Sequence, residues 1–277
     1  MIPLAAGLFG ALIGSFLNVV VHRVPLGRSL SSPPSACPRC GHRIQAWDNI
    51  PVVSWVLLGG RCRGCRTAIS LRYPLVELGT AAFFAVVAWQ RYPSGAYDGA
   101  SGDGWSSAAT ASGVVLIAFL YLAAVSVALA LIDLDTHRLP DRIVLPAYVV
   151  GGVLLTTAAA VVGDYPALVR GAIGLAVLWF AYFAMAWLYP GGMGFGDVKL
   201  AGVLGLYLGW LGWEQVMFGA FAAFLLGGMF AIVLLATRRA DRTSGIPFGP
   251  WMLAGAWAGI FFGEQVAEGY LALFGLT

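Results

Sequence analysis

Four aspartates and one lysine are the residues of this sequence that could carry out acid–base chemistry at a membrane edge. Asp133, Asp135 and Asp141 lie in the stretch IDLDTHRLPD, and Asp197 lies with Lys199, the only lysine of the chain, in GGMGFGDVKL. Both stretches adjoin long apolar runs. An aspartate costs about 2.5–3.5 kcal/mol at the centre of a membrane span and less near its ends. We therefore ask what chemistry would keep these charges there.

Two such carboxylates could act as the pair of an aspartic protease. One takes a proton from a shared water while the other, protonated, polarises the scissile carbonyl. Glycines before Asp197, among them Gly194 and Gly196, would let a substrate strand approach the backbone closely. The residues alone leave three interpretations open: intramembrane hydrolysis, a proton or cation relay in a transporter, and structural capping. The adjacent Asp141 and Arg142 look like an ion pair of this last kind.

The cysteines form a second candidate site. They occur as two C-x2-C pairs, CPRC and CRGC, with 21 residues between them. This spacing fits a tetrahedral zinc site of four thiolates, in which Gly41 and Gly64 would ease the tight turns. A reducing cytoplasm argues against two disulfides, and His42 is more simply a solvated side chain than a substitute ligand. The predicted ligands of this structural zinc are Cys37, Cys40, Cys62 and Cys65.

The elements that must position these residues are transmembrane helices. The chain of 277 residues is 60% hydrophobic and 10% charged, with a mean hydropathy of +0.83, whereas soluble domains carry about 25% charged residues. Positive charge follows the first apolar segment, so we expect a membrane helix there and no cleaved signal peptide. Eight spans are expected, at about 3–21, 74–91, 108–132, 143–162, 168–189, 199–213, 216–236 and 248–275.

Basic residues predict the orientation of these spans. Fourteen of the sixteen lie in or beside the segments on one side of the membrane, which the positive-inside rule assigns to the cytoplasm. Eight of them are arginines of residues 22–73, an insert rich in Pro, Ser and Cys between the first two spans. The opposite side holds a Gly/Ser/Asp-rich loop at 94–108, to which we assign no chemistry. The predicted fold class is an all-α integral membrane protein with a small cytoplasmic zinc-binding insert.

Five stretches, in this order, resemble bacterial type IV prepilin peptidases. They are GSFLNVVVHRVP (14–25), the cysteine-bearing stretch from CPRCGHRIQ to SLRYPLVE (37–77), IDLDTHRLPD (132–141), GFGDVKLAGVLG (194–205) and PFGP (247–250). The Gly-Phe-Gly-Asp core is also similar to the GxGD signature of presenilin-like intramembrane aspartyl proteases. The resemblance implies three parts: a first transmembrane helix at 1–21, the four-cysteine insert at 22–73 and a transmembrane aspartyl peptidase core at 74–277.

The resemblance also implies site residues. One catalytic aspartate comes from IDLDTHRLPD and the other is Asp197. The family's spacing to the aspartate that follows the proline assigns the first role to Asp133, with Asp135 as its rival. Asp141, Lys199, Gly194 and Gly196 match family positions and are expected to have supporting roles.

The resemblance implies cleavage of a basic leader, after a glycine, on the cytoplasmic face of the bacterial inner membrane. The expected partners are type IV prepilins or pseudopilins and the lipid bilayer, and no nucleic acid. Relatives with four cysteines also methylate the new N-terminus with S-adenosylmethionine. The residues show no site for that cofactor, and the insert with RYPLVE, which ends in Glu77, is its expected place. A proton- or cation-coupled membrane transporter with an aspartate relay and a zinc-stabilised scaffold remain the alternatives.

Overall fold

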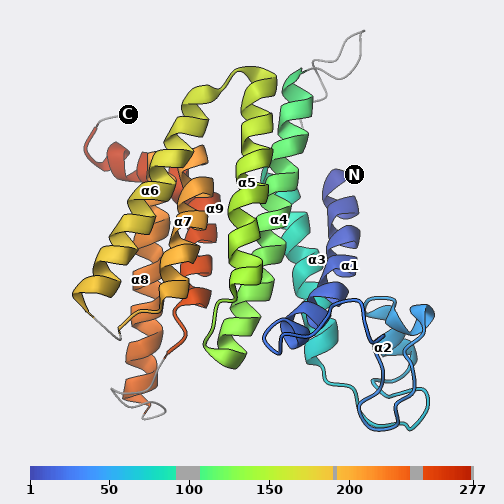
Figure 1. Cartoon of the computed structure of the whole chain (residues 1–277). Coiled ribbons are helices and arrows are strands. Elements are labelled where there is room, and N and C mark those ends of the chain that lie inside the picture. Colours follow the sequence, from blue (N-terminus) through green and yellow to red (C-terminus); the bar gives the residue numbers. More distant parts are fainter. Residues whose placement is uncertain (92–106, 190–191, 238–245, 276–277) are drawn as a thin grey trace. The chain divides into compact units, whose positions relative to one another are not determined.

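The computed structural model describes residues 1–91, 107–189, 192–237 and 246–275 (Figure 1). Regular structure in these residues is helical, apart from two isolated bridges between extended residues of the insert. The chain divides into two compact units, Met1–Pro93 and Ser94–Thr277. Most of the expected outer loop, Gly191 and the arginines at 238, 239 and 242 lie outside the described residues.

The first unit is built on an antiparallel pair of helices, α1 (Ile2–Arg23) and α3 (Arg72–Arg91). Glycines on α1 bring the two backbones together. A Cβ on Gly10 would lie 2.8 Å from the Thr80 carbonyl oxygen, and one on Gly14 would lie 2.8 Å from the Cα of Glu77. Small residues at such a seam are typical of helices that pack in a membrane, where close van der Waals contact replaces the hydrophobic effect.

The insert that connects α1 to α3 contains two short helices, η1 (Ala46–Asn49) and α2 (Val53–Leu57). Side-chain hydrogen bonds join its own segments to one another. The Trp55 indole donates to the Ile69 carbonyl (3.2 Å), and the Arg63 guanidinium binds the Asp48 carboxylate (2.6 Å). The insert is thus an ordered part of the first unit.

The described part of the second unit consists of six helices. Short connections at 137–140, 163–164 and 212 make neighbours in sequence run antiparallel (Figure 1). Helix α7 contacts α5, α6, α8 and α9, and α4 contacts α5 and α9. The helices are α4 (Ser107–Thr136), α5 (Asp141–Val162), α6 (Tyr165–Leu188), α7 (Phe195–Leu211), α8 (Trp213–Ala236) and α9 (Gly249–Leu273).

Helix α7 is the core of this unit. It is buried from Leu200 to Gly209 without interruption, as expected for a helix that is apolar on all faces. Its closest partner is α6. A Cβ on Gly174 of α6 would lie 2.5 Å from the Gly205 carbonyl oxygen, and one on Gly209 would lie 2.6 Å from the Arg170 carbonyl oxygen. The Arg170 side chain also donates to the carbonyls of Gly209 and Trp210 (both 2.8 Å), which satisfies the C-terminal end of α7.

In the part of the chain that the structure describes, five helices are long and apolar enough to cross a membrane: α1, α4, α5, α6 and α8. Helix α7 has only 17 residues, and α3 and α9 contain glutamates. Large apolar side chains such as Phe180, Phe221 and Ile232 are exposed on the outer faces, as expected where lipid covers the protein. The prediction of an all-α integral membrane protein with about eight long helices and a small four-cysteine insert is confirmed.

Candidate active site and metal centre

Asp133 lies in the last turn of α4 and is the buried member of its acidic stretch. Only 5% of its surface is exposed, whereas Asp135 is exposed. Two residues along a helix correspond to a rotation of about 200°, so these side chains leave opposite faces. The helix ends at Thr136, where the backbone amide of His137, at φ +53°, donates to the Asp133 carbonyl (2.8 Å). The end of α4 therefore directs Asp133 into the second unit.

A glycine 116 residues away in the chain holds the Asp133 carboxylate. The backbone N–H of Gly249, the first residue of α9, donates to Asp133 Oδ2 (3.0 Å). The first amides of a helix have no partner within it and carry partial positive charge. A Cβ at position 249 would lie 2.7 Å from the same oxygen. The sequence pointed to PFGP only as a matching stretch, and no local signal could link this glycine to Asp133.

Asp197 occupies the third position of α7. Its Oδ2 accepts the backbone N–H of Gly194 (3.1 Å), and its own N–H donates to the Gly194 carbonyl (3.0 Å). This carboxylate thus caps the helix that it belongs to. The cap is the reason why α7 begins at Phe195, four residues before the predicted start at 199.

The ends of three helices bring the two carboxyl groups together. Leu139 lies in the link after α4. A Cβ added to Gly196, at the start of α7, would be 3.0 Å from the Cβ of Leu139. A Cβ added to Gly249, at the start of α9, would be 3.2 Å from the Cδ2 of Leu139. The carboxyl groups of Asp133 and Asp197 are close enough to interact electrostatically. Leu139 thus lies where a side chain on Gly196 would be, and close approach of a substrate strand to these glycines stays a prediction.

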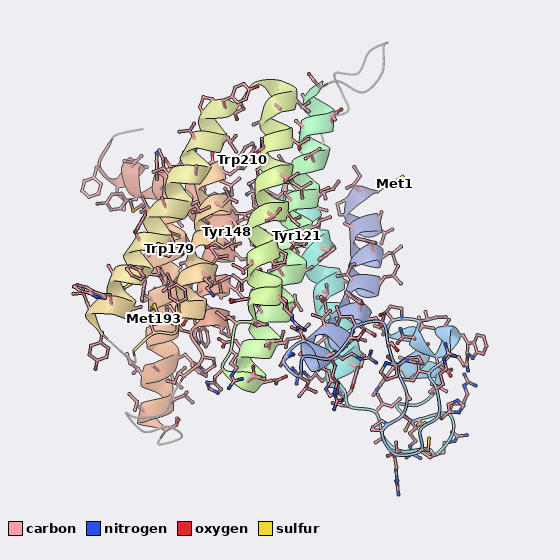
Figure 2. All side chains as sticks on the ribbon, viewed as in Figure 1. Met1, Tyr121, Tyr148, Trp179, Met193 and Trp210 are labelled. Carbon is pink, nitrogen blue, oxygen red and sulfur yellow. The ribbon has the colours of Figure 1, made fainter. Side chains whose placement is uncertain are left out.

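Lys199 forms an ion pair across two helices. Its Nζ lies 2.8 Å from both carboxylate oxygens of Asp141, the first residue of α5. The expected local pair of Asp141 with Arg142 is therefore wrong, because Asp141 turns toward α7 instead. The Tyr148 hydroxyl of α5 donates to the Lys199 carbonyl (2.5 Å), and Figure 2 shows Tyr148 between α5 and α7. These contacts fix the first turn of α7, which carries Asp197.

Aromatic side chains cover one side of the site. Tyr182 of α6 is buried, and its ring lies 5.5 Å from that of Phe224 and 6.4 Å from that of Phe248. Tyr182 is also close enough to Asp197 to interact with it electrostatically. Because Phe248 directly precedes Gly249, the aromatic group adjoins the amide that holds Asp133. The carboxyl pair therefore lies beside an apolar surface that limits the access of water.

The four cysteines of the insert come together as predicted. Their sulfur atoms all lie within 4.8 Å of one another, with Cys37 Sγ 3.8 Å from Cys65 Sγ and Cys40 Sγ 4.0 Å from Cys62 Sγ. A tetrahedral zinc site with bonds of about 2.3 Å has sulfur–sulfur edges of about 3.8 Å. A disulfide requires about 2.05 Å. The donor set therefore fits a metal ion, and His42 is not part of it.

Each pair forms the same backbone turn. Cys37 N–H donates to the His42 carbonyl (2.9 Å) and Cys62 N–H to the Thr67 carbonyl (2.8 Å). The left-handed residue of the first turn is Gly41 (φ +70°), as expected, but that of the second is Arg66 (φ +59°) and not Gly64. Gly64 serves a different purpose. A Cβ there would lie 3.4 Å from His42 and 3.6 Å from Cys40 Sγ, so the small residue lets the two turns approach.

The turns also prepare the sulfur atoms for a metal. Hydrogen bonds from the backbone amides of Cys40 and Arg39 lower the pKa of Cys37 to about 6. A thiol must lose its proton to become a metal ligand. The first turn thus favours the thiolate form of Cys37 at neutral pH, whereas burial and the neighbouring thiols raise the pKa of Cys40 to about 11.

Fold and site together define a class: an all-α membrane protein in which two carboxyl groups meet at helix ends, with a four-thiol metal site in a separate unit. The model of the bacterial peptidase A24 N-terminal domain matches residues 8–91, and that of the type IV leader peptidase family matches residues 102–232. The chain belongs to the prepilin leader peptidase/N-methyltransferase family. The resemblance of the five stretches is thereby confirmed.

Several relatives match almost the whole chain. The prepilin leader peptidase/N-methyltransferase of Aeromonas salmonicida is 38% identical over 96% of this chain and 92% of its own length. The relative from Pseudomonas aeruginosa is 35% identical over 97% of this chain and 93% of its own length. The relative from Burkholderia pseudomallei is 35% identical over 96% of this chain and 86% of its own length. No solved structure matches the chain. These relatives do not favour the transporter alternative.

Proposed function

We propose that this chain is a membrane aspartyl endopeptidase that removes the basic leader of type IV prepilins or pseudopilins at the cytoplasmic face of the bacterial inner membrane. The observation that carries the proposal is the approach of Asp133 and Asp197, which come from two helix ends that are far apart in the sequence. The names of the relatives, prepilin leader peptidase/N-methyltransferase, support the same substrate class. They also support methylation of the new N-terminus.

The two carboxyl groups would share one proton and hold one water molecule. The ionised carboxylate takes a proton from the water, whose oxygen attacks the scissile carbonyl carbon. The protonated partner gives its proton to the carbonyl oxygen, which yields a neutral gem-diol. When the C–N bond breaks, one carboxyl group protonates the leaving nitrogen and the other recovers a proton from the gem-diol. The pair then again carries one proton.

The helix ends support this chemistry. Each aspartate accepts a backbone N–H at the beginning of a helix, where partial positive charge offsets a negative carboxylate. The aromatic group of Tyr182, Phe224 and Phe248 keeps the surroundings apolar, and a low local dielectric strengthens each hydrogen bond to the reacting atoms. A water held there meets both carboxyl groups in a fixed orientation.

We assign the four thiolates to a structural zinc ion. The ion would cross-link the two turns of the insert, and four protein ligands leave no open position for a catalytic water. S-adenosylmethionine would supply an electrophilic methyl group. Glu77 ends the stretch RYPLVE, where this cofactor was expected, but its carboxylate is buried and accepts the backbone N–H of Val52 (2.7 Å). We therefore derive no methyl-transfer step from it.

The test is cleavage of a purified prepilin by the purified chain in detergent, followed by mass spectrometry of the products. We expect cleavage after the leader glycine, and a precursor with that glycine replaced serves as the control. Cleavage should persist with a chelator for as long as the insert stays folded, because aspartates hold the water. Inhibition by the chelator with the insert intact, or no cleavage by folded protein, would contradict the proposal. Products formed with and without S-adenosylmethionine test methylation separately.

A further inference from the structure

The insert of the first unit exposes a cluster of large apolar side chains around α2. Leu57 is 80% exposed and Trp47 63% exposed. Positions 53, 56 and 57 of α2 share one helix face, since residues three and four apart are neighbours on a helix. A contiguous apolar surface of this kind marks an interaction site more often than scattered exposed residues do. The α2 patch consists of Trp47, Ile50, Val53, Val56 and Leu57.

The opposite face of α2 anchors the patch. The buried Ser54 hydroxyl donates to the Trp47 carbonyl (2.7 Å) and accepts the Ile50 backbone N–H (3.0 Å). Trp55 donates its indole N–H to the Ile69 carbonyl (3.2 Å). The patch is therefore preorganised, with its inner face bound to the insert and its apolar side chains directed outward.

A hydrogen bond sets the level of α2 along the helix pair. The backbone N–H of Val52, directly before α2, donates to Glu77 Oε2 of α3 (2.7 Å). Glu77 lies opposite Gly14 of α1, and α1 continues nine residues beyond Gly14 to Arg23. At 1.5 Å per residue, Glu77 is about 13 Å from that end of α1. The start of α2 thus lies alongside the last nine residues of a membrane-spanning helix and not beyond its end (Figure 1).

The charge of the insert favours an anionic surface. Residues 22–73 contain eight arginines and one acidic residue, Asp48, which Arg63 neutralises (2.6 Å). Juxtamembrane basic residues are attracted to anionic lipid head groups. The four cysteines belong to the turns at 37–42 and 62–67, and none of them is part of the α2 patch. The apolar and metal-binding parts of the insert are thus separate.

We propose that the α2 patch docks into the interfacial layer of an anionic phospholipid bilayer. Its apolar side chains enter the boundary between head groups and acyl chains, as those of interfacial amphipathic helices do. The arginines of the insert meet the lipid phosphates, and the Val52–Glu77 hydrogen bond holds the patch at this level. The first unit then contacts the membrane through two helices and this patch.

The test is photo-crosslinking of the full chain in nanodiscs of phosphatidylethanolamine and phosphatidylglycerol. Leu57 is replaced by p-benzoylphenylalanine in one variant and Val56 in a second, because both side chains are exposed. Pro38, exposed between the first two cysteines, receives the same group as the matched control. We expect several times more lipid adduct from positions 56 and 57 than from position 38, with a smaller yield in neutral phosphatidylcholine. Mass spectrometry identifies the adducts and does not depend on peptidase activity.

Other results would overturn the proposal. Adducts of positions 56 and 57 with residues 94–277 of the same chain, with a second copy or with an added prepilin would identify a protein surface as the occupant. Equal lipid adducts from positions 38 and 57 would show that the patch has no preference for the bilayer. Zinc content and the thermal unfolding temperature of each variant establish that the insert is folded before the adducts are compared.

Discussion

Asp133 and Asp197 are each held by one backbone amide, and both amides belong to glycines at the beginning of helices. Gly194 precedes α7 and Gly249 begins α9. An amide hydrogen bond orients a carboxylate without introducing a second charge, and the helix N-terminus favours its ionised form. The remaining carboxylate oxygens stay available for a water and a shared proton. The same contacts therefore serve structure and chemistry.

The contact of Gly249 with Asp133 leads to a steric prediction. In Gly249→Ala the amide is retained, but the new Cβ would lie 2.7 Å from Asp133 Oδ2 and 3.2 Å from Leu139. We expect cleavage to fall by about tenfold or more, equivalent to at least about 1.4 kcal/mol in the barrier. The control is Gly228→Ala on α8, where a Cβ meets nothing within 4 Å. Equal cleavage rates of the two variants would show that this close approach is dispensable.

The ion pair of Asp141 and Lys199 should affect cleavage less than the contact of Gly249 with Asp133 does. Its side chains are 54% and 23% exposed, respectively, and pairs screened by solvent contribute about 0–1 kcal/mol. We expect Asp141→Asn to lower the free energy of unfolding by less than about 1 kcal/mol and to leave cleavage within a few-fold of wild type. Urea unfolding in mild detergent and the prepilin assay measure the two effects. Loss of cleavage as complete as in Asp197→Asn would instead place Asp141 among the reacting groups.

Helices α6 and α7 form a seam that depends on the absence of side chains. In Gly174→Ala the Cβ would lie 2.5 Å from the Gly205 carbonyl oxygen and 3.1 Å from the Gly209 Cα, both backbone atoms that cannot rotate away. Overpacking of this kind costs about 1–3 kcal/mol, and we expect a lower thermal unfolding temperature. Gly152→Ala on α5 has open space and should stabilise slightly, because alanine favours helix more than glycine does. Stability changes of the same sign and size in the two variants would contradict the close packing of α6 against α7.

Much of this helical framework could be predicted from the sequence, because length and apolar composition are local properties. The span expected at 143–162 and the helix Asp141–Val162 nearly coincide. The start of α7 was predicted four residues too late. Apolar composition predicts only the apolar part of a helix, whereas the Gly194–Asp197 cap begins α7 in the polar residues before it. The left-handed conformation of Arg66 was also missed, because glycine is the usual residue for such a turn.

The candidate site was predictable in its residue types and less so in its contacts. The buried position of Asp133 and the exposed position of Asp135 follow from where α4 ends, which the sequence fixes only to within a few residues. The amide of Gly249 and the hydroxyl of Tyr148 come from other helices. Such contacts depend on how the helices pack, and one sequence carries no local signal for that.

The chain divides its tasks between two compact units, with the thiolates in one and the aspartates in the other. A four-cysteine metal site would stabilise the insert because its ligands come from two turns that few apolar contacts connect. The described residues of the second unit contain no such group of metal ligands. Loss of the ion should therefore be a local event.

This division predicts the effect of removing the metal. Wild-type protein should contain close to one zinc ion per chain, and the double variant Cys37→Ser/Cys62→Ser should contain none. In the variant we expect faster amide hydrogen exchange at residues 35–70 and unchanged exchange in α4 to α9, because binding of the ion is coupled to folding of the insert alone. His42→Ala is the control and should keep the zinc ion. A metal-free protein with a fully protected insert would refute this assignment.

The central claim is that Asp133 and Asp197 form the catalytic pair, and it is tested most directly by the cleavage rate of a purified prepilin. Asp133→Asn, Asp197→Asn and Asp135→Asn would be compared with wild type, after folding has been checked by thermal unfolding. Asparagine keeps the shape of each side chain but can neither take up nor release the shared proton. We expect cleavage to be abolished in the first two variants and retained in Asp135→Asn. Full activity of Asp133→Asn or Asp197→Asn would contradict the claim.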